Sequence, residues 1–150
     1  MRTRLCLLRH GRAAGQGPEA RLLPEGEAHV ASLGRRLARE GIAPVAAYSS
    51  TFRRAVDTAT IVLAELGSSV PLVQVRELVP DAGCADALEA LTLRGLPAGH
   101  VLVVTHLPLI AELALGLTDR HVNFLPGTLA EIELGPDRLS GVLKRVLERA

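Results

Sequence analysis

The stretch LCLLRHGRAAG, residues 5–15, places an unbroken apolar run, residues 5–8, directly before Arg9, His10 and Gly11. A short apolar run bounded by polar residues indicates a strand that is buried on both faces. The strand then ends on a cation, an imidazole and a glycine. Two interpretations fit this ending: an ordinary polar turn, or a strand that brings a reactive histidine to the rim of a sheet.

The rest of the chain alternates short apolar runs with segments of helical periodicity. Strands are predicted at residues 4–8, 45–49, 71–75 and 100–105, and helices at residues 25–41, 52–67, 85–95 and 108–117. Glycines follow the periodic part of the first two helices and predict where they end. This alternation predicts a parallel sheet with helices on both sides. We expect a three-layer α/β/α fold, formed by a single domain over residues 1–150.

The C-terminal part of the sequence has a different pattern. Residues 128–134, TLAEIEL, alternate like a strand with one exposed face, and the turn-rich segment GPDRLSG follows them. Residues 142–147, VLKRVL, fit either a returning strand or a terminal helix. We favour the strand, which would give the mostly parallel sheet an antiparallel C-terminal edge.

The composition excludes several classes of partner. The net charge of +1 gives no bias toward nucleic acid or an anionic membrane, and the 2% aromatic content argues against stacking platforms for single strands. The two cysteines, Cys6 and Cys84, match no zinc or CxxC spacing. No stretch reads as a signal peptide or a bilayer span. We therefore expect a cytoplasmic protein without a nucleic-acid or membrane partner, and we predict no oligomeric state.

Polar residues follow each of the four predicted parallel strands. In an open α/β sheet, ligands bind beyond the carboxyl ends of the strands, so these residues should gather at one edge. Taken singly, such a residue is more often a solvated strand end than part of a site. Taken together, Arg9, His10, Arg54 and His106 favour a site, with Glu77 as a further candidate and Arg53 expected to face solvent. The residues that follow the strands are Arg9-His10-Gly11, Ser49-Ser50 with Arg53 and Arg54, Arg76-Glu77, and Thr105-His106.

This set of side chains suits the chemistry of a phosphoryl group. Two arginines can hold a dianion through forked hydrogen bonds, and a neutral imidazole nitrogen is a competent nucleophile toward phosphorus. We expect the second imidazole, when protonated, to bind the equatorial oxygens. Gly11 would let the backbone approach the phosphate closely. Phosphoryl transfer depends mostly on positioning and electrostatics, so such a pocket can act without a metal.

Three ordered motifs resemble those of the histidine phosphatase superfamily, the phosphoglycerate-mutase-like group. LLRHG at residues 7–11 is similar to its opening signature, YSSTFRRAVDTA at 48–59 to the block with the second arginine, and VLVVTHLPLI at 101–110 to the block with the second histidine. The resemblance covers nearly the whole chain. Within the superfamily the chain looks most like the SixA-type protein-histidine phosphatases, because it is short and carries the sequence THLPL.

The resemblance implies a phosphoglycerate-mutase-like fold, transient phosphorylation of His10 and no cofactor. It also implies that Arg9, Arg54 and His106 bind the phosphoryl group and that Glu77 protonates the leaving oxygen. Around this centre we expect contacts between the substrate and four further residues. These are Gly11, Arg12, Arg21 and Thr105.

The chain departs from the family pattern at several positions. Thr51 stands in place of the usual proline, Asp57 in place of a frequent glutamine, and Thr105 in place of a common glycine, which would narrow the pocket floor. The segment RELVPDAG, residues 76–83, lacks the fuller motif of the sugar-phosphate mutases. This argues against mutase activity and weakens the assignment of Glu77 as an acid. A phosphohistidine substrate would tolerate a weak acid, because its nitrogen leaving group departs with less assistance.

Three functions remain open at this stage. The first is a phosphatase that removes phosphate from a histidine on a partner protein, such as a histidine phosphotransfer domain. The second is a phosphatase for a small phosphomonoester, a sugar or nucleotide phosphate, with Arg12, Arg21, Asp81 and Asn123 as candidate specificity residues. The third is a non-catalytic phosphate-binding module, against which the intact pair of His10 and His106 argues.

Overall fold

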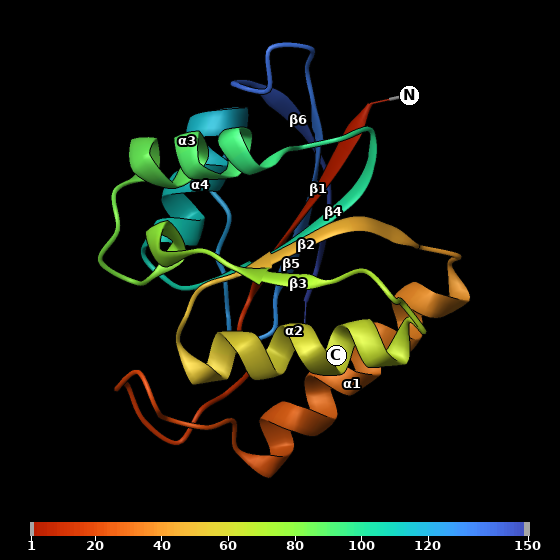
Figure 1. Cartoon of the computed structure of the whole chain (residues 1–150), viewed down its shortest axis with the longest axis vertical. Coiled ribbons are helices and arrows are strands. Elements are labelled where there is room, and N and C mark those ends of the chain that lie inside the picture. The colour runs from red at the N-terminus through yellow and green to blue at the C-terminus, as the bar shows by residue number, and fades with distance from the viewer. Residues whose placement is uncertain (1, 149–150) are drawn as a thin grey trace.

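A six-stranded sheet with two helices on each side forms the fold (Figure 1). The computed structural model describes residues 2–148. Its elements, in chain order, are β1 (Thr3–Arg9), α1 (Pro24–Arg39), β2 (Pro44–Ser49), α2 (Arg53–Glu65), β3 (Leu72–Gln74), the short 3₁₀ turn η1 (Arg76–Leu78), α3 (Cys84–Arg94), β4 (Gly99–Thr105), α4 (Leu109–Thr118), β5 (Leu129–Leu134) and β6 (Gly141–Leu147).

The strands lie in the order β3-β2-β4-β1-β5-β6. The first four of these run parallel, while β5 pairs antiparallel with β1, and β6 pairs antiparallel with β5. The three-layer α/β/α prediction is therefore confirmed, together with the antiparallel C-terminal edge. The strand interpretation of residues 142–147 is also confirmed, because these residues form most of β6.

The alternation of side chains along β1 divides the core into two clusters. Leu5 and Leu7 pack in the cluster that contains the buried faces of α3 and α4. Cys6 and Leu8 pack in the other cluster, with the buried faces of α1 and α2. Successive residues of a strand point to opposite faces, so an apolar run with no polar interruption is what a sheet covered on both faces requires.

The helix ends follow the sequence prediction with small shifts. Pro24 begins α1, where its missing N–H costs no hydrogen bond. Gly41 and Gly67 adopt φ values of +76° and +63° just beyond α1 and α2, in the left-handed region that glycine enters most easily. The sequence did not predict η1. It forms where β3 ends after only three residues, and it carries Glu77.

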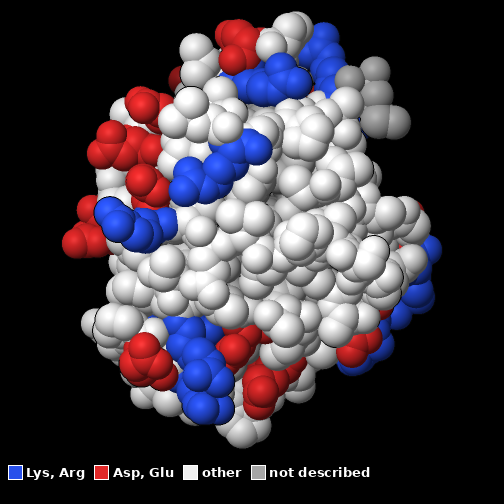
Figure 2. All heavy atoms as spheres, in the orientation of Figure 1, with Lys and Arg blue, Asp and Glu red and all other residues white. Residues whose placement is uncertain are grey.

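Charged residues of both signs are mixed on the surface. On the face seen in Figure 2, blue and red side chains lie around the margin, and a broad area over β3 carries neither colour. No helix among residues 2–148 has both the length and the apolar character needed to cross a membrane.

Candidate active site

The two histidines leave the sheet side by side. The parallel register of β1 and β4 pairs Arg9 with Thr105, and the N–H of His10 donates to the Thr105 carbonyl at 3.2 Å. The next residues along the two strands are His10 and His106, whose ring centroids lie 4.8 Å apart at an interplanar angle of 55°. Residues 96 positions apart in the sequence thus share one edge of the sheet, as the strand ends predicted.

His10 presents one nitrogen as a nucleophile. Its Nδ1 lies 2.8 Å from the Gly11 carbonyl oxygen, to which it donates, so Nε2 keeps its lone pair. The Nε–H of Arg54 donates to this Nε2 at 3.3 Å. Burial, together with the positive charges of Arg54 and Arg9, lowers the pKa of His10 to about 4, although the bond to Gly11 opposes the shift. The imidazole is therefore neutral at pH 7.

His106 is oriented by a hydroxyl. Its Nε2 lies 2.6 Å from Ser50 Oγ, which also accepts the backbone N–H of Phe52 at 3.1 Å. The Ser50 hydroxyl can donate to Nε2 in the tautomer of His106 that carries the ring N–H on Nδ1. None of residues 2–148 bonds to this Nδ1, which is buried. An anion oxygen could accept it.

The pKa of His106 is lowered as well. Burial, then the nearby His10 and the charges of Arg54 and Arg9, lower the pKa of His106 to about 3. A bound anion would act in the opposite direction, so contact between a protonated His106 and a phosphoryl group stays a prediction. With its N–H on Nδ1, the neutral ring also offers one donor.

Arg54 is held by two loop carbonyls and by His10. The residue is 6% exposed, and its Nη1 donates to the carbonyl oxygens of Gln16 at 3.2 Å and Gly17 at 2.8 Å. The guanidinium lies over the ring of Phe52, 5.1 Å from its centroid. Its Nε–H donates to His10 Nε2. Nε and Nη2 together form a guanidinium edge that suits a two-point contact with a phosphoryl group, once the Nε–H turns from His10 to a phosphoryl oxygen.

Arg9 completes the cationic side of the site. Its Nη1 donates to the Phe124 carbonyl at 2.9 Å, while its buried Nε has no hydrogen-bond partner among the described residues. Burial, followed by the charge of Arg54, lowers the pKa of Arg9. No carboxylate within residues 2–148 forms an ion pair with Arg9 or Arg54. Two partly desolvated cations without an internal counter-ion favour binding of an anion.

Gly11 lies close to α1. Its N–H donates to Thr58 Oγ1 at 3.0 Å, and a side chain on Gly11 would meet Val30 at 3.0 Å and the Gly26 carbonyl at 3.1 Å. This close packing is one reason for a glycine here, and the expected approach of a phosphate to Gly11 stays a prediction. Thr58, which also donates to the Arg54 carbonyl, was not predicted as a site residue. Its position one turn after Arg54 on the same helix was the available signal.

The remaining predicted residues differ in burial and in hydrogen-bond partners. Thr105 is fully buried, and its hydroxyl donates to the Leu78 carbonyl at 2.6 Å. Glu77 is half-buried, and its Oε1 is buried without a partner among the described residues. Arg12 is exposed beside Glu25, and Arg21 is exposed, with its carbonyl bonded to the N–H of Ala14 and its side chain unpaired among residues 2–148. The structure therefore brings neither arginine into contact with the histidine pair.

Arg53 points away from this centre, as predicted. Its Nε bonds both carboxylate oxygens of Asp57 at 3.3 Å. Sequence reasoning missed the contributions of Ser50, Phe52 and the carbonyl groups of Gln16, Gly17 and Phe124. The carbonyl contributions had no signal in the sequence, because every residue has a carbonyl.

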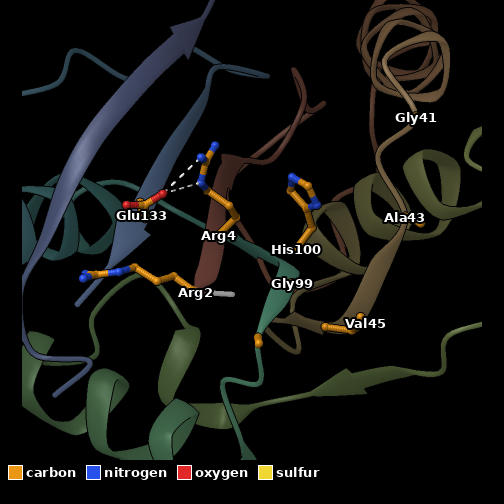
Figure 3. Close-up of a pocket in the computed structure, with 9 residues that line it drawn as sticks. Arg2, Arg4, Gly41, Ala43, Val45, Gly99, His100 and Glu133 are labelled. Carbon is orange, nitrogen blue, oxygen red and sulfur yellow. Dashed lines mark hydrogen bonds and ion pairs between the residues drawn. The ribbon is translucent and has the colours of Figure 1, made fainter. Parts of the chain in front are cut away.

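A separate cavity lies at the opposite edge of the sheet (Figure 3). Its volume is about 460 Å³, and it is lined at the start of β1 and β4 by Arg4 and His100. In Figure 3 Arg4 is bonded to Glu133, so its charge is already compensated.

Residues 2–148 contain no group of three or more His, Cys, Asp or Glu side chains that could hold a metal ion.

Comparisons with known proteins give the family and the fold. The sequence profile of the histidine phosphatase superfamily (branch 1) matches residues 5–79, half of the chain. The matched segment includes His10, Arg54 and Glu77. Comparison with curated protein sequences gives no match.

Solved structures extend the similarity to the whole fold. The protein histidine phosphatase SixA, complexed with tungstate, superposes with a TM-score of 0.86 at 23% identity, over 97% of this chain and 96% of that chain. A chain from Agrobacterium tumefaciens assigned as a phosphohistidine phosphatase SixA gives 0.81 at 22% identity, over 100% of both chains. A mycobacterial glucosyl-3-phosphoglycerate phosphatase complexed with VO₃ gives 0.73 at 17% identity, over 99% of both. At these identities the likeness establishes the fold and leaves the substrate open.

Proposed function

The chain belongs to the histidine phosphatase superfamily, and we propose that it hydrolyses its substrates through a phosphohistidine formed on His10. The observation that carries this proposal is the arrangement around Nε2 of His10. This nitrogen is unprotonated, lies 3.3 Å from Arg54 Nε, and belongs to a ring that is 7% exposed. A desolvated neutral imidazole beside a guanidinium that has no carboxylate partner among residues 2–148 suits attack on a bound phosphoryl group.

In the first step, Nε2 of His10 attacks phosphorus while the bond to the leaving group breaks. Arg54 and Arg9 hold the phosphoryl oxygens, and the Nδ1–H of His106 donates to one of them. Glu77, when protonated, gives its proton to the leaving atom. In the second step, water attacks phosphorus, Glu77 accepts its proton, and the phosphorus–nitrogen bond breaks. Phosphate and free His10 result.

Bound oxyanions in similar structures support an anion site of this kind. Two of the superposed phosphatases are complexed with tungstate and with VO₃. Tungstate resembles phosphate in its four oxygens, and VO₃ resembles a phosphoryl group in transfer, which has three equatorial oxygens. We propose that the same kind of anion lies between Arg9, Arg54 and the two histidines in this protein.

Within this function, we propose phosphohistidine on a partner protein as the substrate. Leu107 and Leu125 are 38% and 48% exposed, and each adjoins a residue of the site: His106 in the first case, and Phe124, whose carbonyl binds Arg9, in the second. Exposed apolar side chains next to residues of the site suit a protein surface better than a sugar. A small phosphomonoester stays the second candidate, because a glucosyl-3-phosphoglycerate phosphatase shares the fold.

The covalent mechanism is tested by His10→Ala. We expect phosphate release to fall to background, while vanadate binding partly survives because both arginines remain. His100→Ala is the matched control, since His100 lies at the other end of β4 from the site. Undiminished turnover by His10→Ala would overturn the mechanism.

The substrate is tested by comparing kcat/KM across a panel. The panel contains a phosphorylated histidine phosphotransfer domain, sugar phosphates and nucleotides. We expect the protein substrate to be turned over most efficiently. Leu107→Asp should lower kcat/KM for that substrate alone. Faster turnover of a small phosphomonoester would replace the protein assignment with the second candidate.

A further inference from the structure

Thr105 connects three segments of the proposed site. It is the last residue of β4 and immediately precedes His106, its carbonyl accepts the N–H of His10, and its hydroxyl donates to the Leu78 carbonyl at 2.6 Å. The side chain is fully buried. Its hydroxyl bond spans 27 residues of sequence and crosses from β4 to the turn η1.

The partner of this bond is the residue next to Glu77. The turn η1 consists of Arg76, Glu77 and Leu78, and the side chain of Leu78 is buried in the core. Upstream, the N–H of Val75 donates to the Ser49 carbonyl at 2.8 Å, which fixes where the turn begins. Downstream, the Thr105 hydroxyl fixes where it ends. Glu77 lies between these two bonds.

The carboxyl group of Glu77 is held without being neutralised. Its Oε1 is buried, and no described residue donates a hydrogen bond to it. No basic side chain in residues 2–148 forms an ion pair with it. A carboxyl group that is placed by its backbone and left unpaired is available to a bound substrate.

We propose that Thr105 is a positioning residue for Glu77: its hydroxyl holds η1 against the end of β4, so that the carboxyl reaches the leaving atom of a substrate bound at His10. This inference rests on the proposed function, in which Glu77 carries the proton. The donor, Thr105, is the residue before His106, and the acceptor, Leu78, is the residue after Glu77. The hydrogen bond therefore connects the backbone next to the acid with the backbone next to a histidine of the phosphoryl site.

The inference predicts an effect that depends on the leaving group. An alkyl phosphomonoester needs a proton on its leaving oxygen, whereas p-nitrophenyl phosphate has a leaving group that departs with little assistance. The ratio of kcat/KM for the alkyl ester to kcat/KM for p-nitrophenyl phosphate therefore reports on the acid, because kcat/KM does not include the later hydrolysis of phosphorylated His10, which is the same for both substrates. Glu77→Gln should lower this ratio about 100-fold. Thr105→Val, which keeps the shape and removes the hydroxyl, should lower it about tenfold.

Two further variants separate positioning from stability. Thr105→Ser keeps a hydroxyl and should restore the ratio. Thr3→Val is the matched control, because Thr3 is 3% exposed and its hydroxyl donates at 2.7 Å to the Leu96 carbonyl, at the opposite end of the sheet. Both valine variants should lower the melting temperature, but only Thr105→Val should change the ratio. If Thr105→Val does not fold, Thr105→Ala takes its place.

The possible outcomes distinguish this inference from the function on which it rests. A reduced ratio in Glu77→Gln beside an unchanged ratio in Thr105→Val overturns the inference alone. An unchanged ratio in both variants overturns the acid role of Glu77 as well. A loss in Thr105→Val that is equal for the two substrates, or that Thr105→Ser does not restore, assigns Thr105 a structural role only. Loss of His10 chemistry is detected independently, by His10→Ala.

Discussion

At the scale of single residues, the site depends on which hydrogen-bonding groups are left free. Arg54 has five N–H groups, and the loop carbonyls of Gln16 and Gly17 bind those of Nη1. The Nε–H of Arg54 donates to His10 Nε2, and no carbonyl among residues 2–148 bonds its Nε or Nη2. For His10, the Gly11 carbonyl binds Nδ1, so Nε2 is the nitrogen that keeps a lone pair. The sequence predicts an arginine and a histidine at the site, but not which nitrogen atoms of their side chains the backbone carbonyls bind.

Arg54→Lys tests whether the planar guanidinium of Arg54, and not only its charge, is required. Lysine keeps the positive charge but lacks the planar edge and cannot bond both carbonyls in the same geometry. We expect kcat/KM to fall about 10²- to 10³-fold, the usual loss when one donor to a developing charge is removed. Steady-state kinetics at pH 7 provides the measurement.

The neighbouring arginine supplies the control for this experiment. Arg53 precedes Arg54 in α2 but bonds Asp57 in a partly exposed ion pair. Arg53→Lys should leave kcat/KM within about twofold of the wild type, since exposed ion pairs contribute little. Similar losses of kcat/KM in the two variants would contradict a specific role for the planar guanidinium of Arg54.

At the scale of elements, the start of α1 presses against the segment that follows His10. A Cβ on Gly26 would collide with the Arg12 carbonyl and lie 2.9 Å from the Arg12 nitrogen. A Cβ on Gly11 would likewise meet Val30 and the Gly26 carbonyl of α1. The absence of a side chain at Gly11 and at Gly26 thus lets α1 approach the loop that follows β1. The helix could be predicted from its apolar spacing, but the approach could not.

Gly26→Ala tests this contact. Alanine normally favours a helix over glycine, but here the collision with backbone should decide the sign. We expect a loss of about 1–3 kcal/mol in the free energy of unfolding, the usual cost of overpacking. Displacement of the Arg12 backbone, two residues from His10, should also lower kcat/KM about tenfold. Urea denaturation and steady-state kinetics measure the two effects.

A second helical glycine gives the opposite expectation. A Cβ on Gly116 in α4 would meet only Cys84 Sγ, at 3.8 Å, an ordinary contact. Gly116→Ala should therefore raise the free energy of unfolding by about 0.5–1 kcal/mol, with kinetics unchanged. A Gly26→Ala variant that is also stabilised would show that α1 does not press on the loop.

At the scale of the whole molecule, burial of the two site histidines ties stability to pH. Their ordinary pKa is 6.5, and burial lowers it to about 4 for His10 and about 3 for His106 in the folded protein. Between pH 6.5 and pH 4 the unfolded chain therefore binds protons at these positions that the folded chain does not bind. The histidine contribution is complete above pH 6.5 and is lost as the pH falls through the folded pKa values.

We accordingly expect the free energy of unfolding to decrease from pH 7 to pH 4.5. The slope should be smaller in a His10→Asn His106→Asn variant, which has no imidazoles to charge at these positions. Urea denaturation at several pH values measures both slopes. Equal slopes in the two proteins would contradict the lowered pKa values. Vanadate, which adds an anion beside the cations, should flatten the slope of the wild type because it favours the charged imidazoles.

Local patterns by themselves determined the strands, the helices and the set of candidate residues. Periods of two and of about 3.6 are properties of consecutive side chains, so the α/β class and the ends of β1 and β4 could be predicted from sequence. Only the tertiary structure decided that the Thr105 hydroxyl binds Leu78, that Ser50 orients His106, and that Arg12 and Arg21 stay outside the centre. These outcomes depend on the strand register and on which carbonyl groups the packed chain brings within about 3 Å of a donor, distances that no local pattern encodes.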